Sequence, residues 1–142
     1  MYYVEKIFRI PIGHRLSKHI GNCFNPHGHN ISIEVKIKSE KLNQNDMVID
    51  FSDLKKIVND HIINPMDHCL ILNNNDKTEI KLCDSDREFK IMKINGDPTA
   101  ENLSKLIFES LEDHFHRDYP ELILCSVKIW ENEDSAASYS KV

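Results

Sequence analysis

Residues 27–38 read HGHNISIEVKIK, and this stretch indicates the class of fold more clearly than any other part of the chain. From Ile31 to Lys38, β-branched apolar residues alternate with polar ones, which is the pattern of an antiparallel strand with one buried face. Successive side chains of a strand point to opposite faces, so an extended backbone from residue 27 puts His27 and His29 on the apolar face. The stretch therefore predicts a strand that carries two histidines toward the core.

Three other segments have strand patterns. The opening stretch alternates from Val4 to Ile12 and is expected to bend at Pro11-Ile12-Gly13. Residues 123–130 and 137–140 are expected to form a C-terminal hairpin around a turn at residues 132–135. The residues of its first strand that share one parity, and are therefore expected to face inward, are Ile123, Cys125, Val127, Ile129 and, beyond them, Glu131.

Two segments between these strands have helical spacing. The first is predicted to begin at Asp50 or Ser52 and to end before Pro65, and the second to begin after a cap at residues 97–99 and to end at Tyr119. The order is strand, strand, helix, helix, strand, strand, which predicts an α+β domain. Residues 76–96 do not fit this order, and a small added hairpin of residues 79–82 and 89–93 is expected there.

Composition limits the possible classes of protein. The chain has 142 residues, a net charge of −5 and 40% hydrophobic residues, which is enough for one core that buries roughly 68–70% of the unfolded chain's surface. A single domain over residues 1–142 is expected. The acidic balance argues against nucleic acid or an anionic membrane as partner. No stretch approaches the ~20 apolar residues of a membrane span, and no secretory signal begins the chain, so we expect a cytoplasmic protein with free thiols.

Eight histidines are the unusual feature of the composition. His14 lies at the end of the preceding strand, and antiparallel pairing could bring it beside His27 and His29. Three histidines without a fourth protein ligand are typical of a catalytic zinc site. The spacing alone is weak evidence, because His114 and His116 share it and are expected to be solvated on a helix surface.

Other chemically active residues have an ordinary interpretation as well as a functional one. Cys23 lies four residues before His27, where its sulfur could be a fourth ligand or a reactive thiolate. Asp67 and His68 could form a proton relay, although such a pair is often incidental. An inward-facing Glu131 needs a partner, either a heterocycle with adjacent N–H donors or a lysine or arginine. The thiols of Cys69, Cys83 and Cys125 are expected in the core or on the surface.

Taken together, these motifs resemble the 6-pyruvoyl-tetrahydropterin synthase and 6-carboxytetrahydropterin synthase family. The resemblance covers most of the chain and adds a tunnelling fold (T-fold), in which a four-stranded antiparallel sheet has two helices on one face in the order ββααββ. The motifs that carry it are His14-Arg15-Leu16, Cys23-x-x-x-His27-Gly28-His29-Asn30, Met47-Val48-Ile49-Asp50-Phe51-x-x-Leu54-Lys55, Asp67-His68 followed by Leu70 to Leu72-Asn73, Pro98-Thr99-x-Glu101-Asn102-Leu103 and Trp130-Glu131.

The resemblance implies how the residues would divide the chemistry. It implies a Zn²⁺ held by three residues, which are His14, His27 and His29. Cys23 would then be the general base, and Asp67 and His68 would form a proton relay that a neighbouring subunit contributes. The substrate implied is 7,8-dihydroneopterin triphosphate, a pterin with a triphosphate side chain.

The resemblance also implies how the substrate is held and how the chain assembles. Glu131 would anchor the pterin ring, and Thr99 and Glu101 would line its pocket. Family members form trimers whose strands close a β-barrel, and two trimers stack into a homohexamer with each active site at a subunit interface. Such closure covers the edge strands of a lone sheet.

Two branches of the family share this machinery. Residues 48–51 (Val-Ile-Asp-Phe) favour the branch that is a zinc-dependent lyase of queuosine biosynthesis and releases triphosphate and acetaldehyde to give 6-carboxytetrahydropterin. The alternatives are the triphosphate-eliminating pyruvoyl synthase of biopterin synthesis and a non-catalytic metal- or pterin-binding homologue. Two departures from the family pattern are the bulky Ile10-Pro11-Ile12-Gly13 before His14 and the long 76–96 segment.

Overall fold

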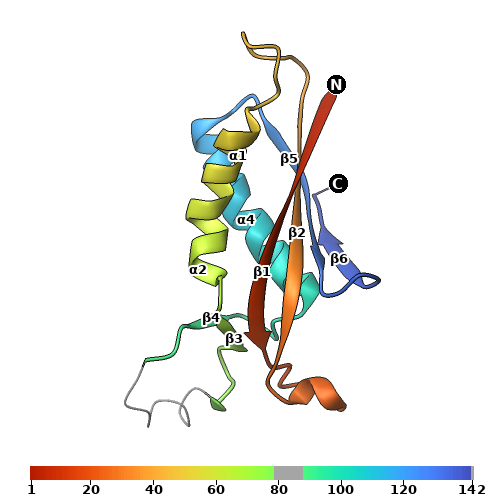
Figure 1. Ribbon diagram of the computed structural model, residues 1–142, viewed down its shortest axis with the longest axis vertical. Helices are drawn as coiled ribbons and strands as arrows, with labels where there is room; N and C mark the ends of the chain where they lie inside the picture. Colours follow the sequence, from red (N-terminus) through yellow and green to blue (C-terminus); the bar gives the residue numbers. More distant parts are fainter. Residues whose placement is uncertain (79–87, 142) are drawn as a thin grey trace.

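The computed structural model describes residues 1–78 and 88–141, and its strands form one mixed sheet covered on one face by helices (Figure 1). The strands are β1 (Tyr2–His14), β2 (His27–Ser39), β3 (Leu70–Asn73), β4 (Ile91–Ile94), β5 (Ile123–Trp130) and β6 (Ala136–Tyr139). The main helices are α1 (Phe51–Val58), α2 (Asn64–Met66) and α4 (Ala100–Asp118). The predicted α+β T-fold architecture is confirmed.

The sheet has the strand order β4-β3-β1-β2-β5-β6. The four predicted strands form its antiparallel part, β1-β2-β5-β6. The expected four-stranded sheet is extended by two short strands, because β3 adds to β1 in parallel and β4 adds to β3 in parallel. Of the hairpin expected in residues 76–96, residues 79–82 lie outside the described residues. The prediction for residues 89–93 is wrong, because β4 pairs in parallel with β3.

The alternating pattern of β2 forms the floor of the core. Its apolar residues are all buried, with Ile33, Val35 and Ile37 at 0% exposure. The helices pack on this face, α4 over β5 and β6 and α1 against β1, and the buried residues form one hydrophobic cluster. Among the described residues, no helix is both long and apolar enough to cross a membrane.

Both helices begin as the sequence predicts, but the first ends differently. Asp50 caps α1 by accepting the backbone N–H of Ser52, and Thr99 caps α4 by accepting that of Asn102. The first helix was expected to end before Pro65. Instead α1 continues through a π-helical turn (Asn59–Ile63) into α2, which contains Pro65. Pro65 has no N–H to donate, and it lies directly after the π-helical turn, in which the N–H of Asn64 bonds to the carbonyl of Asn59.

The inward parity predicted for Ile123 and Cys125 is wrong. Ile37 pairs with Leu124 while Lys36 pairs with Ser126, so Cys125 is an extra residue in a β-bulge. Before the bulge, the even-numbered residue Leu124 points to the core, whereas after it the odd-numbered residues do. Leu124 is therefore 7% exposed and Ile123 is 48% exposed, whereas Val127 and Ile129 are buried as predicted.

The bulge can be tested by a pair of substitutions. We expect Leu124→Ala to lower the free energy of unfolding by about 2–5 kcal/mol, because it leaves a cavity in the core. Ile123→Ala, the matched control, is expected to change it by about 0.5 kcal/mol or less. Urea unfolding followed by circular dichroism measures both. The reverse order of the two effects would contradict the bulge.

Candidate metal centre

Three histidines from the two longest strands meet at one end of the sheet. The antiparallel register of β1 and β2 pairs His14 directly with His27, and Ile12 with His29. Residues directly opposite each other in such a pair have neighbouring side chains, and the two-residue period puts His29 on the same face as His27. Potential ligand atoms of the three histidines lie within 4.8 Å of one another, and they form the group in the described chain that could hold a metal ion.

The hydrogen bonds of two of these histidines fix which nitrogen is free. His14 Nδ1 lies 2.7 Å from the carbonyl oxygen of Pro98, and His27 Nδ1 lies 2.7 Å from that of Asn25. A carbonyl can only accept, so both Nδ1 atoms carry the proton and donate. In the neutral rings both Nε2 atoms then present lone pairs, and they are 2.9 Å apart. Either a proton or a metal ion between the two nitrogens removes the repulsion of these lone pairs, and the convergence of the two Nε2 atoms fits a shared metal ion.

His14 is the buried member of the group, at 1% exposure. Burial lowers the pKa of His14, and positive charge on His27 or His29 lowers it further, whereas the Pro98 carbonyl and Glu131 act in the opposite direction. A lowered pKa keeps this imidazole neutral near pH 7. A neutral imidazole is the form that binds a metal, so His14 is ready as a ligand without losing a proton.

Cys23 lies in the connection between β1 and β2, in a short 3₁₀ turn (Asn22–Phe24). Its side chain is half-buried and its thiol is free. Within the described residues the metal-binding group consists of the three histidines and does not include Cys23. Of the two roles left open by the sequence, the arrangement therefore favours a thiol outside the ligand set over a fourth ligand.

The pair Asp67–His68 follows α2, and its side chains are on the surface. His68 Nδ1 lies 2.7 Å from Asp67 Oδ1, and the two side chains are 77% and 42% exposed, His68 being the more exposed. The backbone N–H of His68 donates to the carbonyl of Pro11 in β1, which holds the pair beside the sheet. The predicted contact between the two residues is present, and within one chain their exposed side chains do not join the histidine group.

The predicted pterin-binding residues come from two places, the end of β5 and the start of α4. Glu131 follows the last residue of β5, is half-buried, and its charge acts on His14. Thr99 follows Pro98, and its hydroxyl is already used as the helix cap. Glu101 is exposed in the first turn of α4. The fold thus brings Glu131 and Thr99 toward the metal centre and leaves Glu101 on the surface.

Other predictions about histidines and cysteines have mixed outcomes. The side chain of His114 is 12% exposed and its ring lies 4.2 Å from that of His61, so a solvated position is wrong for this residue, whereas His116 is exposed as expected. The cause is the contact between α4 and the helical turn after α1. Cys69 is buried and Cys125 half-buried, while Cys83 lies outside the described residues.

The sequence did not reveal the groups that orient the ligands. The carbonyls of Pro98 and Asn25 fix the imidazole rings, yet main-chain acceptors leave no mark in the residue types. The acidic residues Asp76 and Asp97 are both 6% exposed and bond to the segment after His14. Acidic residues are seldom buried without partners, but their partners are far away in the sequence.

Comparisons with known proteins agree with this geometry. A family model described as 6-pyruvoyl tetrahydropterin synthase matches residues 3–142. A protein of Haemophilus influenzae named 6-carboxy-5,6,7,8-tetrahydropterin synthase is 33% identical, with 99% of this chain and 100% of that protein covered. A protein of Aquifex aeolicus with the same name is 30% identical over 97% of both chains.

Solved structures are similar over the whole chain as well. An uncharacterized protein from Wolinella succinogenes has a TM-score of 0.83 at 20% identity, covering 99% of this chain and 98% of its own. The 6-pyruvoyl tetrahydropterin synthase of Caenorhabditis elegans has a TM-score of 0.72 at 24% identity, covering 99% and 96%. These likenesses concern the fold. The family match over residues 3–142 and the relatives at 30% identity and above establish that the chain belongs to the 6-pyruvoyl tetrahydropterin synthase family.

Proposed function

We propose that this protein is a zinc-dependent lyase that converts 7,8-dihydroneopterin triphosphate to 6-carboxytetrahydropterin, with release of triphosphate and acetaldehyde, in the route to queuosine. The observation that carries the proposal is the approach of the His14 and His27 Nε2 atoms to 2.9 Å, with both Nδ1 protons directed to carbonyls. The two relatives named as 6-carboxytetrahydropterin synthases favour this branch over the pyruvoyl branch.

Zinc is the metal that this donor set suits. Three imidazoles, with no fourth ligand among the residues that the structure describes, leave a coordination position open, as catalytic zinc sites do. When bound, Zn²⁺ would act as a Lewis acid on the hydroxyl groups of the substrate side chain and make the neighbouring protons more acidic. The Pro98 and Asn25 carbonyls would keep His14 and His27 in the tautomer that binds metal.

Proton transfer falls to Cys23, Asp67 and His68. Cys23 is the general base in this proposal, since its thiol is free, half-buried and carried by the connection that joins two of the metal-binding histidines. The His68 imidazole, hydrogen-bonded to Asp67, would exchange protons with the substrate bound to a neighbouring subunit. The high exposure of both side chains in the single chain supports a role at a subunit contact.

Glu131 would bind the pterin ring, because a carboxylate accepts two parallel hydrogen bonds from the ring N–H and the amino group. Its position immediately after β5 and its effect on His14 support a place beside the metal centre. Thr99 and Glu101 would complete the pocket from the start of α4.

The proposed assembly is a trimer or a pair of stacked trimers with a closed β-barrel. The face of the sheet without helices is polar, with a groove of about 540 Å³ lined in part by Arg9, Asn30, Ser32 and Glu34. Such a face suits the water-filled interior of a barrel. An apolar recess of about 360 Å³ lies at the other end of β1, and Tyr2, Tyr3 and Met47 are partly exposed there, which suits a subunit contact.

The metal assignment predicts a loss on removing one ligand. His27→Ala is expected to abolish stoichiometric zinc binding, because two imidazoles hold zinc far less tightly than three. His116→Ala is the matched control, since it removes an exposed histidine of α4. Zinc per chain, measured by elemental analysis after gel filtration, gives the result. Stoichiometric zinc in the His27→Ala protein would contradict the site.

The reaction predicts specific products. Zinc-loaded protein incubated with 7,8-dihydroneopterin triphosphate is expected to yield 6-carboxytetrahydropterin by mass spectrometry and acetaldehyde trapped as a hydrazone. A pyruvoyl product with triphosphate release would place the protein in the other branch. Unchanged substrate would instead favour a non-catalytic binding protein.

The role of Cys23 predicts a loss of turnover without a loss of metal. Cys23→Ala is expected to lower kcat about 10²- to 10⁴-fold, the range for loss of a general base, while zinc per chain stays the same. Cys125→Ala, at a half-buried thiol in the bulge of β5, is the control. Wild-type turnover by the Cys23→Ala protein would show that this thiol is not the base.

A site shared between subunits predicts complementation. Cys23→Ala and His68→Ala subunits are each expected to be inactive alone, and mixed oligomers obtained by co-expression are expected to recover part of the activity. Recovery needs one intact Cys23 and one intact His68 from different chains. The matched control carries both substitutions on every chain and should stay inactive. No recovery in mixed oligomers would mean that one chain supplies both groups.

A further inference from the structure

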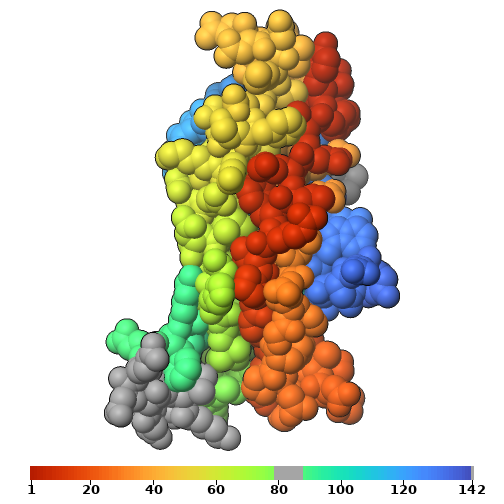
Figure 2. Space-filling model, viewed as in Figure 1, coloured from red at the N-terminus to blue at the C-terminus, as the bar shows by residue number. Residues whose placement is uncertain are grey.

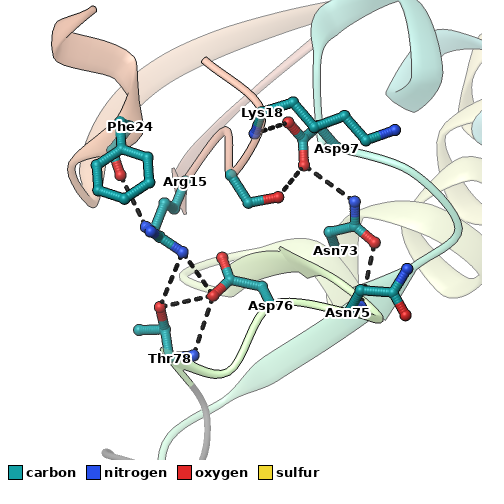
Figure 3. Close-up of polar contacts among 9 residues, drawn as sticks. Arg15, Lys18, Phe24, Asn73, Asn75, Asp76, Thr78 and Asp97 are labelled. Atoms are coloured by element: carbon teal, nitrogen blue, oxygen red, sulfur yellow. Dashed lines mark hydrogen bonds and ion pairs between the residues drawn. The ribbon is translucent and has the colours of Figure 1, made fainter. Parts of the chain in front are cut away.

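The segment between His14 and the 3₁₀ turn that carries Cys23 is fastened by a buried carboxylate. Asp97 Oδ1 accepts the hydroxyl of Ser17 at 2.6 Å and the amide N–H of Asn73 at 3.0 Å, and its Oδ2 accepts the backbone N–H of Lys18 at 2.8 Å (Figure 3). Asp97 is 6% exposed. Burial raises the pKa of the Asp97 carboxyl, but the hydrogen bonds from Ser17, Asn73 and Lys18 outweigh this and lower it overall. The carboxylate therefore stays ionised and accepts every one of these donors.

Arg15 fastens the other end of the same segment. Its Nε donates to the carbonyl oxygen of Phe24 at 2.7 Å, and its guanidinium carbon lies 4.1 Å from the centre of the Phe24 ring. Its Nη1 donates to Asp76 Oδ1 at 2.6 Å and to Thr78 Oγ1 at 3.3 Å (Figure 3). Arg15 thus ties the residue after Cys23 to the segment that follows β3. In Figure 2 this orange segment lies at one end of the molecule, next to the green residues of β3.

Asp97 is also joined to the metal centre through the chain. The next residue is Pro98, whose carbonyl accepts His14 Nδ1 at 2.7 Å. The carbonyl of Asp97 itself accepts the side-chain amide of Asn102 and the backbone N–H of Thr99, which hold the turn at the start of α4. Asp97 therefore holds the Cys23 segment with its side chain. Its main chain supports the turn whose Pro98 carbonyl orients the His14 ring.

We propose that Asp97 is a positioning residue of the active site, which sets where Cys23 stands relative to the three histidines. The proposal deepens the proposed function, since it rests on Cys23 acting on a substrate at the metal centre. Without Asp97, Ser17 and Lys18 lose their anchor, and the Cys23 turn is then held by Arg15 and by the backbone N–H of Leu16, which donates to the Cys23 carbonyl at 3.0 Å. The side-chain hydrogen bonds of Asp97 go to Ser17, Lys18 and Asn73, so Asp97 would act on Cys23 through the connecting segment.

Asp97→Asn is the informative substitution because asparagine has the same shape as aspartate but replaces one of the two acceptor oxygens with an NH₂ group. The backbone N–H of Lys18 and the amide of Asn73 can only donate at the points where they meet Asp97. An asparagine amide has one oxygen and one NH₂ group. Either orientation therefore places the NH₂ group against one of these donors, and one of the two hydrogen bonds must break.

The first experiment measures thiol alkylation without substrate. Zinc-loaded Asp97→Asn protein is treated with iodoacetamide, and modification of each cysteine is followed by peptide mass spectrometry. We expect Cys23 to be alkylated several-fold faster than in wild type, with Cys125 unchanged. Cys125 is the internal control because it is half-buried and distant in the fold, on β5. An unchanged Cys23 rate, or the same acceleration at both thiols, would overturn the proposal.

The second experiment measures turnover and metal together. We expect kcat to fall about 10- to 100-fold, because a misplacement of a catalytic group by about 1 Å can cost about 10²-fold, with KM and zinc per chain close to wild type. Selective Cys23 alkylation with an unchanged kcat would overturn the positioning role. Because alkylation needs no substrate, a failure of the proposed reaction would appear in the product assay alone and would be distinguishable.

Ser17→Ala is a second variant, in case Asp97→Asn does not fold. It removes a hydroxyl of the connecting segment and leaves the carboxylate paired with Lys18 and Asn73. We expect Cys23 to be alkylated faster than in wild type, by less than in Asp97→Asn, with the rate at Cys125 unchanged. In the double variant the effects should be less than additive if both residues act through one hydrogen bond. Wild-type alkylation and kcat in Ser17→Ala, or fully additive effects in the double variant, would overturn the proposal.

Discussion

The antiparallel pairing of β1 with β2 is the constraint on which the rest of the structure depends. The pairing runs without a break from Tyr2 opposite Ser39 to His14 opposite His27. A shift of this register by one residue would turn one strand's apolar residues to solvent and separate the histidines at the same time. The hydrophobic core and the histidine group that could hold a metal ion are therefore specified by the same set of main-chain hydrogen bonds.

The metal centre lies where this sheet meets the start of α4. Each histidine that is oriented by a carbonyl has its proton on the nitrogen that faces away from the other ring, so the free lone pairs converge. The Pro98 carbonyl comes from a turn that α4 needs in any case, since Thr99 caps the helix there. Residues 97–99 thus start α4 and also orient His14. The buried Asp97 connects this turn to the segment that carries Cys23.

Most of the fold was predictable because its elements have strong local patterns. The alternation of residues 31–38 and the helical spacing after Thr99 come from burial of one face, which local sequence records directly. The bulge at Cys125, the π-helical turn before Pro65 and the parallel pairing of β3 and β4 were not predicted. Each depends on which distant residue completes a hydrogen bond, and a periodic pattern contains no information on that partner.

Local sequence pattern was enough to identify the residue types of the site and their faces, because a strand of period two places His27 and His29 on one face and antiparallel pairing can add His14. The tertiary contacts added the carbonyl partners of His14 and His27, the place of Cys23 outside the histidine group, and the fastening of its segment by Asp97 and Arg15. The difference lies in how far apart in the sequence the interacting groups are. Side-chain direction follows from local backbone geometry, whereas hydrogen bonds that orient a ligand join groups up to 84 residues apart.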